Sequence, residues 1–115
     1  MSADRYSKGV KAEGKAALML RLKGYRILKT RYKTPHGEID LIARRGKSLA
    51  FIEVKARDNK AKALEAISSK AQSRIRNAAL QFISEHPEAE ALNMRFDVVA
   101  VYPRSWPQHF ENMWS

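Results

Sequence analysis

Two short segments rich in Ile, Leu, Val and Phe, Glu38–Arg44 and Leu49–Arg57, constrain most strongly what this chain can fold into. Arg45-Gly46-Lys47-Ser48 separates them, and its glycine suits a tight turn, so the pair is predicted to form a β-hairpin. Apolar residues occupy both faces of each segment. Strands of this kind are usually buried on both sides, so the hairpin is expected at the centre of a sheet, with helices covering it.

The flanking sequence supplies the helices and the further strands. In chain order, the predicted elements are a helix over Ser7–Leu22, strands over Tyr25–Tyr32, Glu38–Arg44 and Leu49–Arg57, a charged loop over Asp58–Lys62, a helix from Ser68 or Ser69 to His86, and a strand over Arg95–Tyr102. This α-β-β-β-α-β order predicts an α/β fold, a small mixed sheet flanked by helices. The aromatic tail residues Trp106, Phe110 and Trp114 are expected to pack on it.

Length and composition limit the class of protein. A chain of 115 residues predicts a single domain over residues 1–115, and 44% hydrophobic residues predict that it folds. The absence of cysteine excludes a disulfide scaffold, a Cys-ligated zinc site and thiol catalysis. The polar N-terminus and the lack of a long apolar run disfavour secretion and membrane insertion. A cytoplasmic location is therefore expected.

The net charge of the chain predicts an anionic partner. There are 22 Lys and Arg residues against 12 Asp and Glu, a formal charge of +10. Cationic side chains that neutralise phosphates release counterions and gain affinity, so nucleic acid is the first candidate. A ribosome-associated or simply basic protein would have the same charge, and charge alone does not choose between them.

The few acidic residues fall inside the apolar strands. Glu53 and Lys55 are two residues apart and therefore point to the same face of their strand, and Asp40 interrupts the apolar run of the neighbouring strand. Facing side chains across a hairpin lie roughly 5 Å apart, and diagonal neighbours roughly 7 to 8 Å. Asp40 and Glu53 are thus close enough to share one ligand.

Buried carboxylates need a partner, because an unpaired buried charge is costly. The candidates are Lys55, a metal ion, or both. Mg²⁺ commonly takes one or two protein carboxylates and leaves positions for water and phosphate, and Lys55 could orient or deprotonate an attacking water or stabilise charge on a phosphate. The alternative is an Asp–Lys–Glu salt-bridge cluster without chemistry, and strand pairing alone leaves both open.

Two further acids are candidates for the same site. Glu13 falls inside the apolar stripe of the first helix, the face expected to contact the sheet; the alternative is a flank position paired with a lysine. Glu38 shares the face of Asp40 by its two-residue spacing and is a secondary candidate. It could equally be the solvated start of its strand.

Three motifs carry a resemblance to a known family: Gly37-Glu38-Ile39-Asp40-Leu41-Ile42, Phe51-Ile52-Glu53-Val54-Lys55 and Arg95-Phe96-Asp97-Val98-Val99. Together they resemble the YraN-type uncharacterised bacterial family (a UPF family) of the PD-(D/E)XK nuclease superfamily. The resemblance runs from the helix around Glu13 to the last predicted strand. The chain departs from the superfamily name at its first letter, because Ile39 stands where the motif has proline.

The resemblance implies a restriction-endonuclease-like αβββαβ core with a magnesium site. Asp40 and Glu53 would bind Mg²⁺, for which Mn²⁺ can substitute, with the Val54 carbonyl as a further ligand, and Lys55 would serve the attacking water. Glu13 matches the first-helix acid of archaeal Holliday junction resolvases. Gln72 matches a polar second-helix residue near the site, although an ordinary surface glutamine is the alternative.

Basic residues follow the motif and could hold a phosphate backbone. The predicted nucleic-acid-binding residues are Lys60, Lys62, Lys70, Arg74 and Arg76. A solvated helix face is the alternative for all of them, and for Lys60 and Lys62 it is the preferred one.

The leading hypothesis is an Mg²⁺-dependent endonuclease that hydrolyses phosphodiester bonds of DNA, with structured or branched DNA among the expected substrates. The first alternative is a nucleic-acid-binding module with the same fold and little or no catalysis, and another is a docking protein that uses its aromatic tail. The residues do not separate DNA from RNA. Many relatives of this size act as dimers, which leaves a homodimer open.

Overall fold

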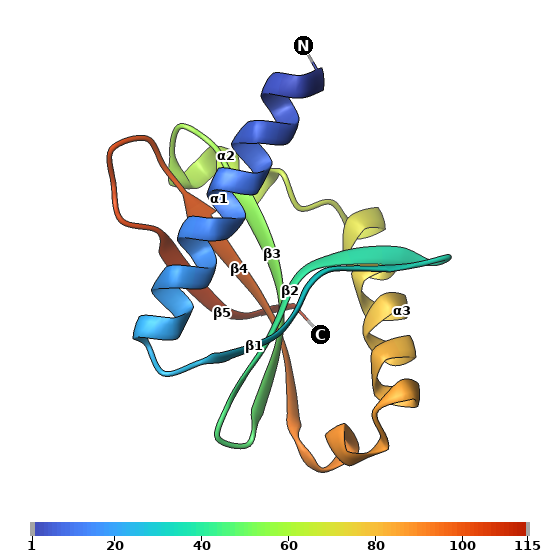
Figure 1. Cartoon of the computed structure of the whole chain (residues 1–115). Coiled ribbons are helices and arrows are strands. Elements are labelled where there is room, and N and C mark those ends of the chain that lie inside the picture. Colours follow the sequence, from blue (N-terminus) through green and yellow to red (C-terminus); the bar gives the residue numbers. More distant parts are fainter. Residues whose placement is uncertain (1, 115) are drawn as a thin grey trace.

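The computed structural model describes the backbone of residues 2–114 and the side chains of residues 9–114. Its elements, in chain order, are α1 (Ser2–Leu22), β1 (Arg26–Thr34), β2 (Gly37–Arg45), β3 (Ser48–Ala56), α2 (Lys60–Glu65), α3 (Ser69–Glu85), the 3₁₀ helix η1 (Pro87–Ala91), β4 (Asn93–Val101) and β5 (Gln108–Trp114) (Figure 1). No helix within residues 2–114 is long and apolar enough to cross a membrane.

The five strands form one mixed sheet in the order β1-β2-β3-β4-β5. β1, β2 and β3 pair antiparallel, β3 and β4 pair parallel, and β5 returns antiparallel to β4. A parallel pair needs a long crossover connection, which here contains α2, α3 and η1. The predicted α-β-β-β-α-β order and mixed sheet are confirmed, and the architecture is compatible with a restriction-endonuclease-like core.

Helices cover the sheet on both faces, as the doubly apolar strands predicted. On one face Ala16 and Leu20 of α1 belong to a buried cluster with Leu41 and Ile52. On the other face Phe82 of α3 belongs to a second buried cluster, which includes Ile42, Leu49 and Phe51. Fully burying one large apolar side chain stabilises a fold by about 1.5–3 kcal/mol, so the hairpin strands are held from both sides.

Two elements differ from the sequence-based expectation. The segment predicted as a charged loop contains α2 from Lys60 onward, because the Asn59 side chain accepts a hydrogen bond from the Lys62 amide and caps a new helix. The tail was expected only to pack on the domain, and it contains the strand β5. Trp114 does stack on Phe96, but the expectation was wrong for Trp106, which is 60% exposed.

A buried carboxylate explains why the polar tail forms a strand. Asp97 of β4 is the fully buried charged residue among the described side chains. It accepts two hydrogen bonds from the Arg95 guanidinium, one from His109 Nε2 at 2.8 Å and one from the Asn112 amide at 2.9 Å. His109 and Asn112 both belong to β5, so a single carboxylate fastens the edge strand to β4.

The partners of Asp97 also decide its ionisation. Burial by itself favours the neutral acid, but the hydrogen bonds from His109, Arg95 and the Asn112 amide outweigh it and hold the pKa of Asp97 below its ordinary value of 3.8. Because the folded-state pKa is the lower one, the stability that this ionisation adds is present above about pH 4. It is lost as the pH falls toward the folded-state pKa.

Replacing this carboxylate should therefore weaken the whole fold. Asp97→Asn is expected to lower the free energy of unfolding near pH 7 by about 3 kcal/mol, since it leaves the Arg95 charge without its buried partner. Urea unfolding followed by circular dichroism measures the loss. Glu111→Gln is the matched control, because it removes the exposed partner of the same arginine and should cost less than about 1 kcal/mol. Equal losses in the two variants would contradict the role given to Asp97.

Candidate functional site

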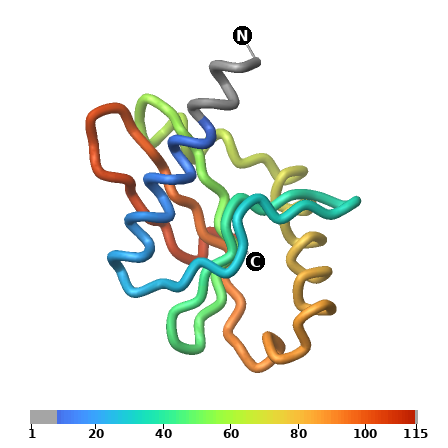
Figure 2. The backbone as a smooth tube through the Cα atoms, viewed as in Figure 1, coloured from blue at the N-terminus to red at the C-terminus, as the bar shows by residue number. Residues whose placement is uncertain are grey.

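The candidate site lies where β2 leaves β3. Pairing between these strands runs from the turn to the Leu41–Ile52 pair and stops there. One step further, the same register would place Asp40 opposite Glu53. β2 instead continues beside β1 alone as far as Gly37, and this hairpin end reaches across α3 (Figure 2). The two acids therefore flank the opening between the separated strands.

At the point where the strands separate, the Asp40 side chain replaces the missing backbone partner with a hydrogen bond. The Val54 amide, which has lost its ladder partner, donates to Asp40 Oδ2 at 2.8 Å. Strict alternation would place Ile39 and Leu41 on one face, yet Ile39 belongs to the α3-side cluster and Leu41 to the α1-side cluster. The alternation is interrupted at Asp40, and the carboxylate is fixed at the point of divergence.

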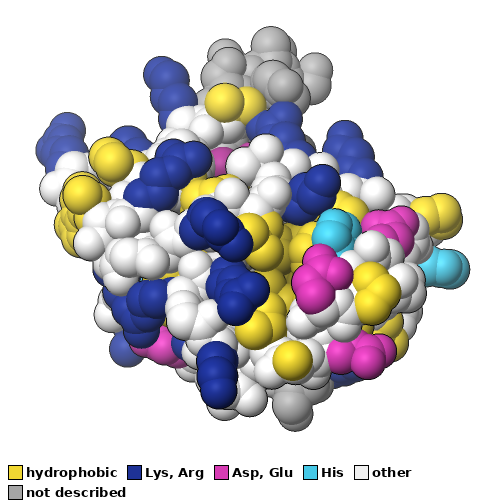
Figure 3. Space-filling model, turned by 60° about the horizontal axis from the view of Figure 1, so that its bottom comes forward, with side chains coloured by type: hydrophobic (Ala, Val, Ile, Leu, Met, Phe, Trp, Pro, Cys, Tyr) yellow, Lys and Arg dark blue, Asp and Glu magenta, His cyan; other side chains and the backbone are white. Residues whose placement is uncertain are grey.

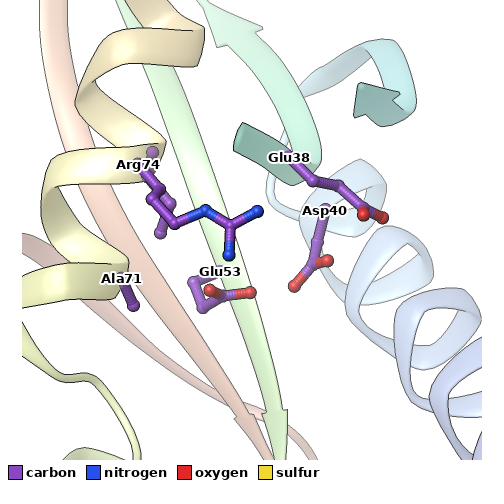
Figure 4. A pocket seen from close by; sticks show the side chains of 6 residues that line it. Glu38, Asp40, Glu53, Ala71 and Arg74 are labelled. Atoms are coloured by element: carbon purple, nitrogen blue, oxygen red, sulfur yellow. The ribbon is translucent and has the colours of Figure 1, made fainter. Parts of the chain in front are cut away.

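A cavity of about 270 Å³ lies on the α3 side of this point. Its lining residues are Glu38, Asp40, Glu53, Ala71, Arg74 and Ile75. Figure 4 shows the Asp40 and Glu53 carboxylates pointing toward each other across the opening, with the Arg74 guanidinium reaching in from α3. Two carboxylates and one guanidinium therefore face one small volume, while the Glu38 carboxylate points away from it (Figure 4).

A second cavity of about 550 Å³ lies on the other side of Asp40 and is walled by α1 and the end of β3. Glu13, Asp40, Val54 and Lys55 are among the residues that line it. Lys55 Nζ lies 3.9 Å from Glu53 Oε2, and both side chains are largely buried. Asp40 thus lines both cavities. The Glu53–Lys55 ion pair also links them, because Glu53 lines the first cavity and Lys55 lines the second.

Crowding of the carboxylates changes the ionisation of Glu53. Burial, a hydrogen bond with Asp40 and the Asp40 charge raise the pKa of Glu53 to about 9, with Lys55 opposing the rise and Glu38 adding to it. At neutral pH the Glu53 side chain therefore carries a proton in this arrangement. A cation placed between the two carboxylates would relieve the repulsion that keeps that proton bound.

Glu13 faces the sheet side as predicted but is already paired. Its Oε1 accepts a hydrogen bond from Arg31 Nε at 2.9 Å, and the Glu13 side chain is 19% exposed. Arg31 holds a positive φ of 50°, which non-glycine residues rarely adopt. Glu13 is therefore paired with a basic residue, as the alternative to a site role predicted, but that residue is Arg31 of β1 and not a lysine.

The donor set suits a hard divalent ion in part. Asp40 and Glu53 supply carboxylate oxygens at one opening, and Mg²⁺ needs only one or two of them beside water and phosphate. Among the described side chains, however, no three Asp, Glu or His residues converge on one ion position. The larger ligand set that includes Glu13 is therefore not assembled while Glu13 is bound to Arg31.

The other predicted residues are distributed unevenly around the site. Arg74 lines the acidic cavity, whereas Gln72 lines neither of the two cavities. Lys60 lies over the Phe110 ring, with Nζ 5.4 Å from the ring centroid, and Lys62 Nζ lies 3.7 Å from Asp58 Oδ2. Lys70 and Arg76 both lie on α3 and line neither cavity. Of the five basic candidates, only Arg74 lines either cavity.

A glycine positions Arg74, and sequence reasoning gave it no such role. A Cβ on Gly37 would lie 2.4 Å from the Arg74 carbonyl oxygen, so only glycine lets the start of β2 approach α3 this closely. The available signal was the glycine directly before the acidic strand. The sequence Thr34-Pro35-His36-Gly37 is typical of a turn, and a turn by itself explains a glycine at this position, so no close contact with another element was predicted.

Comparisons with known proteins identify relatives of the whole chain. The sequence model of the family described as Uncharacterised protein family UPF0102 matches residues 12–101. A UPF0102 protein of Chelativorans sp. (strain BNC1) is 54% identical over 110 residues, which cover 96% of this chain and 89% of that protein. A UPF0102 protein of Parvibaculum lavamentivorans is 48% identical over 109 residues, covering 95% and 82%.

The raised pKa of Glu53 predicts a pH-dependent stability. With divalent ions removed, ionising Glu53 destabilises the folded state, so its contribution to stability is complete below about pH 4.5 and is lost as the pH rises toward 9. Glu53→Gln cannot ionise. It should therefore gain stability relative to the parent protein between pH 5 and pH 9, on the order of a few kcal/mol.

Urea unfolding at pH 5 and pH 9 in the presence of EDTA measures this difference. Glu90→Gln is the control, since Glu90 is an exposed acid on η1 and its substitution should leave the pH profile parallel to that of the parent protein. A parallel profile for Glu53→Gln as well would rule out a strained carboxylate pair.

Proposed function

Because this chain belongs to the uncharacterised protein family UPF0102, whose name states no activity, we propose a function from its site. The protein is a metal-dependent endonuclease that hydrolyses phosphodiester bonds of DNA. One observation carries this proposal: Asp40 and Glu53 face each other where β2 and β3 separate, with Lys55 Nζ 3.9 Å from Glu53. Two carboxylates at the opening supply metal ligands, and the lysine beside Glu53 supplies a cationic proton donor next to them.

The metal would be held by the oxygen atoms of Asp40 and Glu53. When bound there, Mg²⁺ supplies Lewis-acid polarisation of a phosphoryl oxygen and a more acidic water. The Val54 amide holds Asp40 in position through its 2.8 Å hydrogen bond. The structure thus fixes one carboxylate and leaves Glu53 to exchange its proton.

Lys55 and Arg74 complete the site from opposite sides. Lys55 lies beside Glu53, where its ammonium group can orient the attacking water and balance negative charge that develops on the phosphate. Arg74 lines the cavity that the acids share and can hold a phosphate oxygen, since guanidinium groups bind phosphates well. The formal charge of +10 favours a polyanionic substrate over a small neutral one.

A second candidate function is a nucleic-acid-binding module with little or no catalysis. It is favoured by the Glu13–Arg31 pair, which removes a third acid from the opening. The same cavity and the same cationic side chains would then bind a phosphate backbone without hydrolysing it. The two candidate functions therefore have the same ligand, nucleic acid, and differ in whether the bound strand is cut.

Cleavage assays separate these functions. Purified protein is incubated with linear duplex, single-stranded and four-way-junction DNA, with Mg²⁺ or Mn²⁺. Cleavage of at least one substrate is expected, and Lys55→Ala should slow it about 100-fold or more, the usual contribution of a positioned group that stabilises developing charge. Its DNA affinity should change much less.

Lys47→Ala is the control, because Lys47 is an exposed cation in the β2–β3 turn and lines neither cavity of the site. Its cleavage rate should match that of the parent protein. Binding of every DNA without cleavage, even at high protein excess, would favour the binding module.

Metal binding is tested without any substrate. Mg²⁺, or Ca²⁺ as a non-catalytic probe, should raise the melting temperature by about 10 °C at about 100 times the dissociation constant. Asp40→Ala should abolish the rise, whereas Glu90→Gln should preserve it. If the parent protein shows no shift with either ion, the metal site is absent.

A further inference from the structure

A separate cavity of about 290 Å³ opens at the other end of the groove between α3 and the hairpin strands. Ile75 of α3 lines the acidic cavity and Phe82 lines this one, a separation of roughly 10 Å at 1.5 Å per helical residue. Along β2, Asp40 and Arg44 mark the two cavities, roughly 13 Å apart. The second cavity is thus a neighbour of the candidate active site and shares no lining residue with it.

The floor of this cavity is apolar. Leu28, Leu49, Ala89 and Leu92 line it. Leu49 and Ala89 are buried in the α3-side core, and Leu28 and Leu92 are only partly buried at its margin. Its volume suits one large side chain better than an extended chain. An inserted apolar group would therefore exchange water for contact with the hydrophobic core.

The rim of the cavity carries unequal charge. Arg26, Lys29 and Arg44 line it from the strands, against Glu88 and His86 from the end of α3 and η1. Figure 3 shows this side of the molecule, where apolar surface lies between a row of Lys and Arg side chains and a group of acidic and histidine side chains. The rim therefore attracts an anionic group next to the apolar one.

The lining does not suit a nucleobase. Its one benzene ring, Phe82, is 2% exposed and stacked on His86 with ring centroids 4.1 Å apart, so no free aromatic face is offered for base stacking. The side chains that could read the edge of a base, namely Arg26, Arg44, His86 and Glu88, belong to the charged rim, and the apolar floor offers none. A second copy of this chain is disfavoured by its own charge of +10.

We propose that this cavity docks a peptide segment of a partner protein, in which one bulky apolar side chain is flanked by acidic residues. The apolar side chain enters between Leu28 and Leu92, and the acidic residues pair with Arg26, Lys29 and Arg44. Because docking leaves the acidic cavity open, the partner could hold the protein beside a substrate. The proposal does not depend on nuclease activity.

A titration of the ¹⁵N-labelled full chain by NMR tests this proposal. The probe is the peptide acetyl-Asp-Glu-Phe-Glu-Asp-amide, added to millimolar concentration. Saturating shift changes are expected at Leu28, Leu49, Ala89 and Leu92, and added salt should weaken binding. The peptide acetyl-Lys-Lys-Phe-Lys-Lys-amide should cause no such changes.

Charge reversal on the rim gives the second measurement. The exposed pair Arg26→Glu and Lys29→Glu, combined in one variant, should weaken peptide binding at least tenfold, whereas Lys47→Glu in the β2–β3 turn should have little effect. Retained helical circular dichroism shows that the variants are folded. Three results would overturn the proposal: shifts that do not saturate or lie elsewhere, equal binding of the lysine peptide, or a single-stranded oligonucleotide that shifts these resonances while the acidic peptide does not.

Discussion

The separation of β2 from β3 after the Leu41–Ile52 pair is the constraint on which the rest of the site depends. A continued ladder would bury Asp40 against Glu53 with no room between them. Ending it frees the Val54 amide, which binds Asp40, and opens the sheet toward both covering helices. Gly37 permits this geometry, because it lets the departing strand lie against the backbone of α3.

Local rules were sufficient for much of this arrangement. The hairpin, and the burial of both of its faces, follow from the apolar run that each of its two strands contains. The common face of Glu53 and Lys55 follows from their two-residue spacing, and the neighbourhood of Asp40 and Glu53 follows from the position of the turn. These predictions depend on distances of a few residues within one motif.

Other features depend on contacts that no local pattern contains. Arg31 reaches Glu13 from another element and does so from a left-handed backbone conformation. The polar tail from Gln108 becomes a strand because Asp97 binds its side chains and backbone, not because of its own β propensity. The short helix α2 could have been predicted from the sequence, since Asn59 is a good N-cap residue directly before it. Six residues are too few to show a helical repeat of apolar positions, so the charged residues of this segment favoured a loop instead.

The position of β1 at the border of the sheet has a consequence for association between chains. An unpaired border strand can recruit further strands and so begin a fibril. β1 carries Lys29 and Lys33, which are both exposed, while Arg31 between them pairs with Glu13 of α1. A second copy aligned there would bring its own lysines against these two. These exposed lysines thus disfavour edge-to-edge pairing of a sheet whose central strands are strongly apolar.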